Sequence, residues 1–403
     1  MKKLIAIVLS LCILALSGCV KAEPDSTDLL METESTSVKD AQTVPVAEAS
    51  SAASAMTGKN VDLTAVVQEE KNLTKEVVVK GPADWTCNTY RLTLMDDLPE
   101  AEIRSILLPN DNGVAEMKEP ELSGCQVLET GSGKLIYNHN NWISLKASDP
   151  EEKDKYVMIT ELLQWKYRED PSAKPLDLEF MSAQDAENQM KNILNAFHMP
   201  LTPHLSYMAG MDHEQIMDYQ AYLFKNDETY DPFSDRVEMT DLNQDYDAYY
   251  MEFYFTLDGI PVFQSPDFGW YSQAEPEEAY LEICKAEILL TGKGIQQFTL
   301  QAGIQKVEPI ENKPLVDAET AAKNMLLEIG KYPWQGTYQL DAMQLNLVPV
   351  FRFGDHTGTL VPLWCSNMHA EHPDGQWIDC TDSPWNFFID PYTGGQAFES
   401  VKK

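Results

Sequence analysis

The chain has 403 residues, and its 30 Lys and Arg against 64 Asp and Glu give a formal net charge of −34. Hydrophobic residues make up 43% of it, enough for a sizeable core, which excludes disorder of the whole chain. The acidic balance excludes a general nucleic-acid binder, because phosphate contacts need clustered Lys and Arg. Since domains usually have roughly 100–200 residues, the length predicts two or three.

Residues 1–19 have the pattern of an export signal. A lysine pair precedes the apolar run Leu4–Leu16, which is shorter than the roughly 20 residues that span a membrane. The segment Leu16-Ser17-Gly18-Cys19 resembles the bacterial lipobox. That resemblance implies that Cys19 is lipidated, becomes the first residue and anchors the protein to the membrane. The alternative is an uncleaved anchor helix with an ordinary cysteine.

Residues 20–60 are rich in Ser, Ala, Thr and Glu and show no apolar period. Such a composition does not offset the entropy lost on ordering, so this segment is predicted to be a disordered linker. No later apolar run approaches the length of a membrane span. The body of the protein is therefore expected outside the cytoplasm.

The segment 61–175 is predicted to form a β-rich domain. Short alternating or β-branched runs separated by Gly and Asn clusters are typical of strands. They are Val77–Val79, Tyr90–Leu94, Lys134–Tyr137 and Trp142–Leu145. For Tyr156–Tyr167 the pattern fits either a strand or a short helix.

The remainder predicts one arrangement twice, a helix followed by antiparallel strands, in units 178–312 and 313–403. Ser182 and Asp317 are the predicted N-caps of the two helices. The Asp258-Gly259 pair between apolar runs predicts a tight hairpin, and Thr291–Gly294 a second turn. Because a helix can cover the apolar face of such a sheet, the predicted fold class is α+β.

Four short segments resemble PepSY-type domains and the extracytoplasmic YycH/YycI-type regulators of two-component signalling. They are DGIPVF (258–263), GKGIQQF (292–298), LVPVFRF (347–353) and FFIDPYTGGQAF (387–398). The resemblance implies a helix before a sheet, with a last hairpin containing Asp390, Thr393 and Gly394. It rests on short patterns in roughly the C-terminal half, so it supports the fold more than the function. Those regulators carry a transmembrane helix where this chain has a lipobox-like segment, so the resemblance implies no specific kinase partner. Uncharacterised bacterial lipoproteins are similar overall.

Five cysteines follow the lipobox, and an exported protein permits disulfides between them. Cys87 with Cys125 and Cys365 with Cys380 are the candidate pairs, whereas Cys284 is predicted to be a buried thiol. The alternative is that all five are reduced and act as small apolar residues.

Two patterns weakly resemble metal sites, and neither predicts a metal. Cys365, His369, His372 and Cys380 offer zinc ligands, but their spacing matches no standard zinc motif. Asp241–Asp247 resembles the start of a calcium loop, but Tyr246 stands where that loop needs glycine. No metal or cofactor is therefore predicted.

Signatures of common enzyme classes are missing from the sequence, and Gly131–Lys134 is predicted to be a turn rather than a phosphate loop. The favoured function is a non-catalytic binding or regulatory lipoprotein that engages a protein or peptide partner at the cell envelope. Trp270, Trp334 and Trp385 are its candidate contact surface, and the alternative is that these aromatic residues cap a core or close a sheet edge. The alternatives are a solute- or glycan-binding lipoprotein and, third, a cell-wall hydrolase with paired carboxylates.

Overall fold

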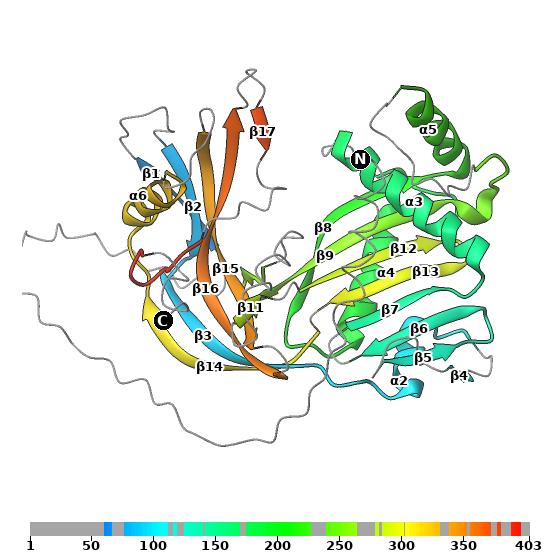
Figure 1. Ribbon diagram of the computed structural model, residues 1–403, viewed down its shortest axis with the longest axis horizontal. Coiled ribbons are helices and arrows are strands. Elements are labelled where there is room, and N and C mark those ends of the chain that lie inside the picture. The colour runs from blue at the N-terminus through cyan, green and yellow to red at the C-terminus, as the bar shows by residue number, and fades with distance from the viewer. Residues whose placement is uncertain are drawn as a thin grey trace, which may run out of the picture. The chain divides into compact units, whose positions relative to one another are not determined.

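The computed structural model describes fourteen stretches of the chain (Figure 1). They are residues 60–66, 76–111, 116–118, 125–139, 142–169, 175–226, 239–263, 279–281, 284–301, 303–330, 338–352, 355–371, 377–379 and 388–395. The signal segment with Cys19 and residues 20–59 lie outside them. None of the helices in these stretches is long and apolar enough to cross a membrane.

Two β-sheets and five α-helices are formed by the described residues, which confirms the predicted α+β class (Figure 1). The helices are α2 (Glu100–Leu107), α3 (Pro150–Glu169), α4 (Ala183–Ala196), α5 (His213–Asn226) and α6 (Ala318–Ile329). A short 3-10 helix, η1, spans Gln244–Tyr246.

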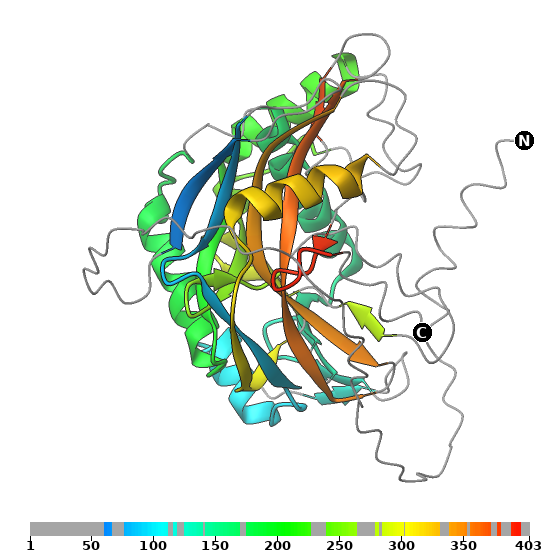
Figure 2. The same cartoon turned by 90° about the vertical axis from the view of Figure 1, so that its left-hand side faces the viewer.

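The first sheet, sheet A, has the strand order β1-β2-β15-β16-β3-β14. These strands span Asn60–Val66, Glu76–Pro82, Tyr338–Arg352, Thr357–Glu371, Thr86–Leu94 and Ile304–Pro314, respectively. Three short strands add to it: β11 (Ala279–Leu281) pairs with β15, while β17 (Trp377–Asp379) and β18 (Phe388–Ile389) pair with β16. All pairs are antiparallel except β2 with β15, and helix α6 lies across this sheet (Figure 2).

The second sheet, sheet B, has the strand order β10-β9-β12-β13-β7-β6-β5-β4, and β8 also pairs with β9. In that order the strands span Ile260–Pro261, Ala248–Leu257, Lys285–Thr291, Gly294–Gln301, Trp142–Ala147, Lys134–His139, Gln126–Glu129 and Glu116–Lys118. Strand β8 spans Thr202–Met211, and every pair in sheet B is antiparallel.

The sheets do not follow the predicted domain boundaries at 175–178 and 312–313. In sheet B, β7 pairs with β13, and in sheet A, β3 pairs with both β14 and β16. Strands of the predicted N-terminal domain therefore complete sheets whose other strands come from the later units.

Helices cover both faces of sheet B. Successive side chains of β9 point to opposite faces of the sheet, and apolar side chains on both faces are buried against helices. Phe253 packs in the same cluster as Met190 of α4, whereas Tyr250 packs with Leu163 of α3. The segment Tyr156–Tyr167, which fits either a strand or a helix in sequence, belongs to α3. Its apolar side chains therefore face the sheet as one helical stripe.

The local signals at turns and helix starts are confirmed. Ser182 caps α4 by accepting a hydrogen bond from the Asp185 backbone N–H. Asp258 and Gly259 have φ values of 52° and 80°, the left-handed pair that a two-residue hairpin between β9 and β10 requires. Asp317 caps α6 and accepts from both the backbone N–H and the hydroxyl of Thr320, at 2.8 and 2.7 Å.

Replacement of the α6 cap, Asp317→Ala, is expected to lower the free energy of unfolding by about 1 kcal/mol, because the first-turn N–H loses its acceptor. The Thr320 backbone N–H holds the pKa of Asp317 below its ordinary value of 3.8. The stabilisation is therefore present above that pH and is lost as the pH falls through the pKa of the folded protein. Urea unfolding at neutral and acidic pH measures both effects, with Glu319→Ala as the control in the same turn. Equal stability of Asp317→Ala and wild type at neutral pH would contradict the prediction.

Candidate functional site

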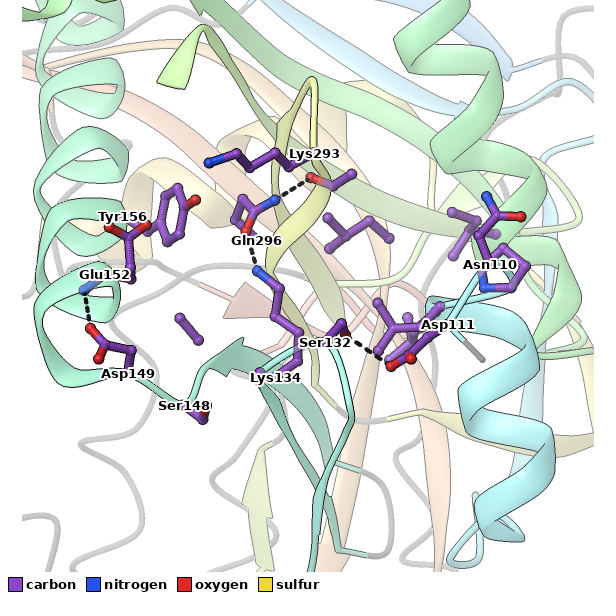
Figure 3. Close-up of a pocket in the computed structure, with 18 of the residues that line it drawn as sticks. Asn110, Asp111, Ser132, Lys134, Ser148, Asp149, Glu152, Tyr156, Lys293 and Gln296 are labelled. Atoms are coloured by element: carbon purple, nitrogen blue, oxygen red, sulfur yellow. Dashed lines mark hydrogen bonds between the residues drawn. The ribbon is translucent and has the colours of Figure 1, made fainter. Parts of the chain in front are cut away.

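A cavity of about 520 Å³ lies at the ends of the inner strands β6, β7 and β13 of sheet B (Figure 3). Five segments line it: the end of α2 with the residues after it, the β5–β6 turn, the end of β7 with the start of α3, the β12–β13 turn, and one face of α4. The polar side chains among the lining residues are Asn110, Asp111, Ser132, Lys134, Ser148, Asp149, Glu152, Tyr156, Gln189, Lys293 and Gln296. A volume of this size suits a small molecule.

Strand register brings these segments together. Lys134 at the start of β6 pairs with Ala147 at the end of β7. Phe298 pairs with Leu145, so the start of β13 lies beside the same end of β7. Lys134 and Gln296 thus stand on the two strands that flank β7, and the small side chain of Ala147 leaves room for them to meet.

Lys134 and Gln296 form the polar centre of the cavity. The Lys134 Nζ donates a hydrogen bond to Gln296 Oε1 (Figure 3). Gln296 is 1% exposed, and its Nε2 donates to Thr291 Oγ1 at 3.1 Å and to the Gly294 carbonyl oxygen at 3.0 Å. Because these two acceptors fix the amide nitrogen, the amide oxygen must face Lys134.

The surroundings of Lys134 disfavour its charged form. Burial lowers its pKa from 10.5 to about 8, Glu152 partly offsets this, and the charge of Lys293 adds to the lowering. The Nζ lies 5.3 Å from the centre of the Tyr156 ring. Among the residues that the structure describes, no carboxylate forms an ion pair with Lys134. Lys134 is therefore a half-buried amine whose partners are a neutral amide and an aromatic ring.

The carboxylates of the cavity are already engaged. Asp111 Oδ2 accepts from Ser132 Oγ at 2.8 Å. Asp149 caps α3 by accepting from the Glu152 backbone N–H at 3.0 Å. Glu152 Oε1 in turn accepts from Tyr246 Oη at 2.7 Å and from Lys155 Nζ at 3.4 Å. These contacts hold the walls of the cavity in place.

A second cation, Lys293, lies at the mouth. Its Nζ is 3.0 Å from Asp245 Oδ2, and its side chain is 49% exposed. An exposed ion pair contributes little to stability, so Lys293 can exchange Asp245 for another anion at small cost. The cavity thus offers two amino groups, one inside and one at the entrance.

A polar groove between α2 and α4 continues from the cavity. It has a volume of about 690 Å³ and shares Pro109, Gln189 and Ile193 with the cavity. Carboxamide side chains dominate its α4 wall, among them Asn188 and Asn192. A ligand longer than the cavity could therefore extend along this wall.

Cys87 lies in β3 of sheet A and Cys125 precedes β5 of sheet B, and both are buried free thiols, as in the reduced alternative. Cys365 in β16 is a buried free thiol as well, and Cys380 lies outside the described residues. Burial raises the pKa of Cys87 to about 12, so this thiol is poorly reactive. Cys284 is fully buried, as predicted.

The candidate aromatic surface of Trp270, Trp334 and Trp385 lies outside the described residues, as does His372 of the zinc-like series. Of the acidic residues in the calcium-like run, Asp241 and Asp245 are exposed and Asp247 is buried. Asp247, 3% exposed, accepts from the backbone N–H and the Nδ1 of His213 at 2.8 and 2.7 Å. No group of three metal-ligating side chains occurs within the described stretches.

The cavity residues are not among the predicted site residues. A signal was present, because Gly131-Ser132-Gly133-Lys134 and Thr291-Gly292-Lys293-Gly294 are both glycine-rich turns that carry a lysine. Only the pairing of β7 with both β6 and β13 shows that the two turns meet.

Comparison with known proteins informs the fold alone. No family model and no curated protein matches the chain. Among solved structures, the chain is similar to an uncharacterized protein from Eubacterium rectale, with a TM-score of 0.53 at 14% sequence identity. The match covers 83% of this chain and 92% of the other.

The free energy of unfolding of Lys134→Met is expected to depend on pH differently from that of wild type. The pKa of Lys134 is about 8 in the folded protein and near 10.5 in the unfolded chain, which therefore binds more protons between these values. Wild-type stability should rise over this window, by roughly 1–3 kcal/mol relative to Lys134→Met. Urea titrations at several pH values measure this difference, with Lys323→Met as the exposed control. Parallel curves for wild type and Lys134→Met would contradict the assignment.

Proposed function

We propose that this protein is an extracytoplasmic binding lipoprotein that takes a small polar solute with an anionic group into the cavity of sheet B. The observation that supports the proposal most is the inward-facing amine of Lys134, which has a neutral amide as its hydrogen-bond acceptor. A carboxylate or phosphate entering the cavity would give this amine the counter-ion that its own surroundings lack.

The electrostatics of the cavity favour such a ligand. Burial of Lys134 in the empty cavity makes its ammonium form unfavourable. An anion beside Lys134 would stabilise that form and so offset the free-energy cost of burial. Lys293 at the mouth supplies a second positive charge against a chain with a net charge of −34. Hydroxyls of Ser132 and Ser148 and the carboxamide of Asn110 provide further polar contacts.

The carboxylates of the cavity favour binding over hydrolysis. A glycosidase needs one acid to give a proton to the leaving group and one carboxylate to act on the sugar. Asp111, Asp149 and Glu152 each accept hydrogen bonds that fix a wall or cap a helix. A peptide or protein partner stays a prediction, because its candidate tryptophans lie outside the described residues.

The proposed location of the protein is supported by its sequence alone. The lipobox-like segment ending at Cys19 supports lipidation and attachment to the outer face of the cell membrane. One or two acyl chains would hold the acidic body there, at about 0.8 kcal/mol per buried methylene. PepSY-like and YycH/YycI-like relationships remain a prediction.

Ligand binding is tested by thermal unfolding with succinate, citrate, glucuronate, inorganic phosphate or a sugar phosphate, and with glucose as the neutral control. At roughly 100 times Kd, a bound anion should raise Tm by about 5 °C. Lys134→Met should abolish the rise because the inner amine is lost, and Lys323→Met should retain it. Glucose stabilising as strongly as every anion, no anion raising Tm, or an undiminished rise in Lys134→Met would each contradict the proposal.

Lipidation is tested separately by growing cells with an alkyne fatty acid and attaching a fluorophore to labelled proteins. The wild-type chain should carry the label and sediment with membranes, and Cys19→Ser should lose the label because it has no acceptor thiol. Cys284→Ser serves as the matched control. An unlabelled wild-type chain in the soluble fraction would refute the anchor without affecting the cavity.

A further inference from the structure

We propose that Lys134 is a covalent anchor for a carbonyl-bearing ligand: its amine condenses reversibly with a small anionic aldehyde or 2-oxo acid to form an imine. The inference rests on the proposed function, because it narrows the anionic solute to one whose carbonyl group can reach Lys134. It assigns Lys134 a chemical role that ion pairing alone does not require.

The contacts of Lys134 suit a nucleophile better than a structural cation. A lysine that only stabilises a fold is usually paired with a carboxylate when it is sheltered from solvent. Lys155 and Lys285 follow that rule: their side chains are 17% and 18% exposed, and they lie 3.2 Å from Glu151 and 2.7 Å from Glu287. Lys134 has the Gln296 amide in that place.

The Gln296 amide also sets the orientation of the amine. A neutral amine can still donate one N–H to Gln296 Oε1, whose position is fixed by Thr291 and Gly294. The nitrogen lone pair then points away from Gln296. Since Lys134 lines the cavity, a bound carbonyl carbon can approach it from the open side (Figure 3).

The state of the amine fits this chemistry. Burial lowers the pKa of Lys134 to about 8, and Lys293 adds to the lowering, so a useful fraction is neutral near physiological pH. Lys155 shows the opposite behaviour on the neighbouring helix, because its hydrogen bond with Glu151 raises its pKa. The same protein thus holds a reactive and an unreactive lysine close to one cavity.

The condensation is balanced without an added reagent. The Lys134 nitrogen forms a bond with the carbonyl carbon, and the carbonyl oxygen leaves as one water molecule that carries both N–H hydrogens. Nothing is oxidised or reduced, and hydrolysis reverses the step. Glu152 lines the cavity and interacts electrostatically with Lys134, while its Oε1 stays bonded to Tyr246 and Lys155, so the protons pass to and from solvent in the cavity. Lys293 can pair with the carboxylate of the ligand at the entrance.

Reductive trapping tests the proposal on the full chain. Glyoxylate with sodium cyanoborohydride converts an imine into a stable carboxymethyl-lysine, which intact-mass analysis and peptide mapping locate. Lys134 should be labelled at least about tenfold faster than Lys155 or Lys323, because the neutral fraction of an amine rises tenfold for each unit by which its pKa falls. Glycolate, which lacks the carbonyl group, should leave no adduct, and Lys134→Arg should abolish the fast labelling.

The outcome is separable from that of the proposed function. Lys134 is compared with other lysines of the same wild-type molecules, so the conclusion does not depend on whether a variant folds. Labelling of Lys134 no faster than that of Lys155 and Lys323 would overturn the covalent role. If Lys134 were not labelled faster but succinate still raised Tm in wild type and not in Lys134→Met, the proposed anion binding would be supported and only the imine would be contradicted. Protection of Lys134 from glyoxylate by succinate would place both events in one cavity and support the proposal.

Discussion

The hydrogen bond from Lys134 to Gln296 is the interaction on which the site depends. A buried ammonium normally needs a negative partner, because the low dielectric around it makes an unpaired charge costly. Here the partner is an amide held by Thr291 and Gly294, and its oxygen has no alternative orientation. The fold therefore holds a destabilised cation at the ends of the inner strands of sheet B, and the proposed anionic ligand would recover that free-energy cost.

The architecture provides this contact through strands from distant parts of the chain. Lys134 comes from β6 and Gln296 from β13. Strand β7 lies between them, and its Ala147 is paired with Lys134. Helix α3, which covers one face of sheet B, contributes Tyr156 and Glu152, while α4 on the other face contributes Gln189. Because register fixes which side chains share a face, a one-residue slip of β6 or of β13 against β7 would put the amine and the amide on opposite faces of the sheet.

Local features of the fold could be predicted from the sequence, whereas the site could not. Ser182 and Asp317 predict helix starts by their N-cap chemistry, and Asp258-Gly259 predicts a hairpin. These signals can be found in sequence because a cap and a tight turn depend on neighbouring residues only. Helices α2 and α5 are not among the predicted elements: α2 has only eight residues and no side-chain cap. The choice between a Cys87–Cys125 disulfide and two free thiols could not be made from spacing. Sequence spacing does not show that the chain leaves sheet A for sheet B between the two cysteines. The meeting of Lys134 with Gln296 needs the pairing of three strands, and no local pattern encodes it.

The most direct test of this account is the titration of Lys134 itself, followed by NMR of protein labelled with ¹³C at the lysine Cε. One resonance, missing from Lys134→Met, should titrate with a midpoint of about 8, below the ordinary lysine value of 10.5. Addition of an anion that binds should move that single midpoint upward, because the ligand favours the ammonium form. A Lys134 resonance with a midpoint at the ordinary value of 10.5 would contradict the account, since the amine would then be an ordinary solvated cation.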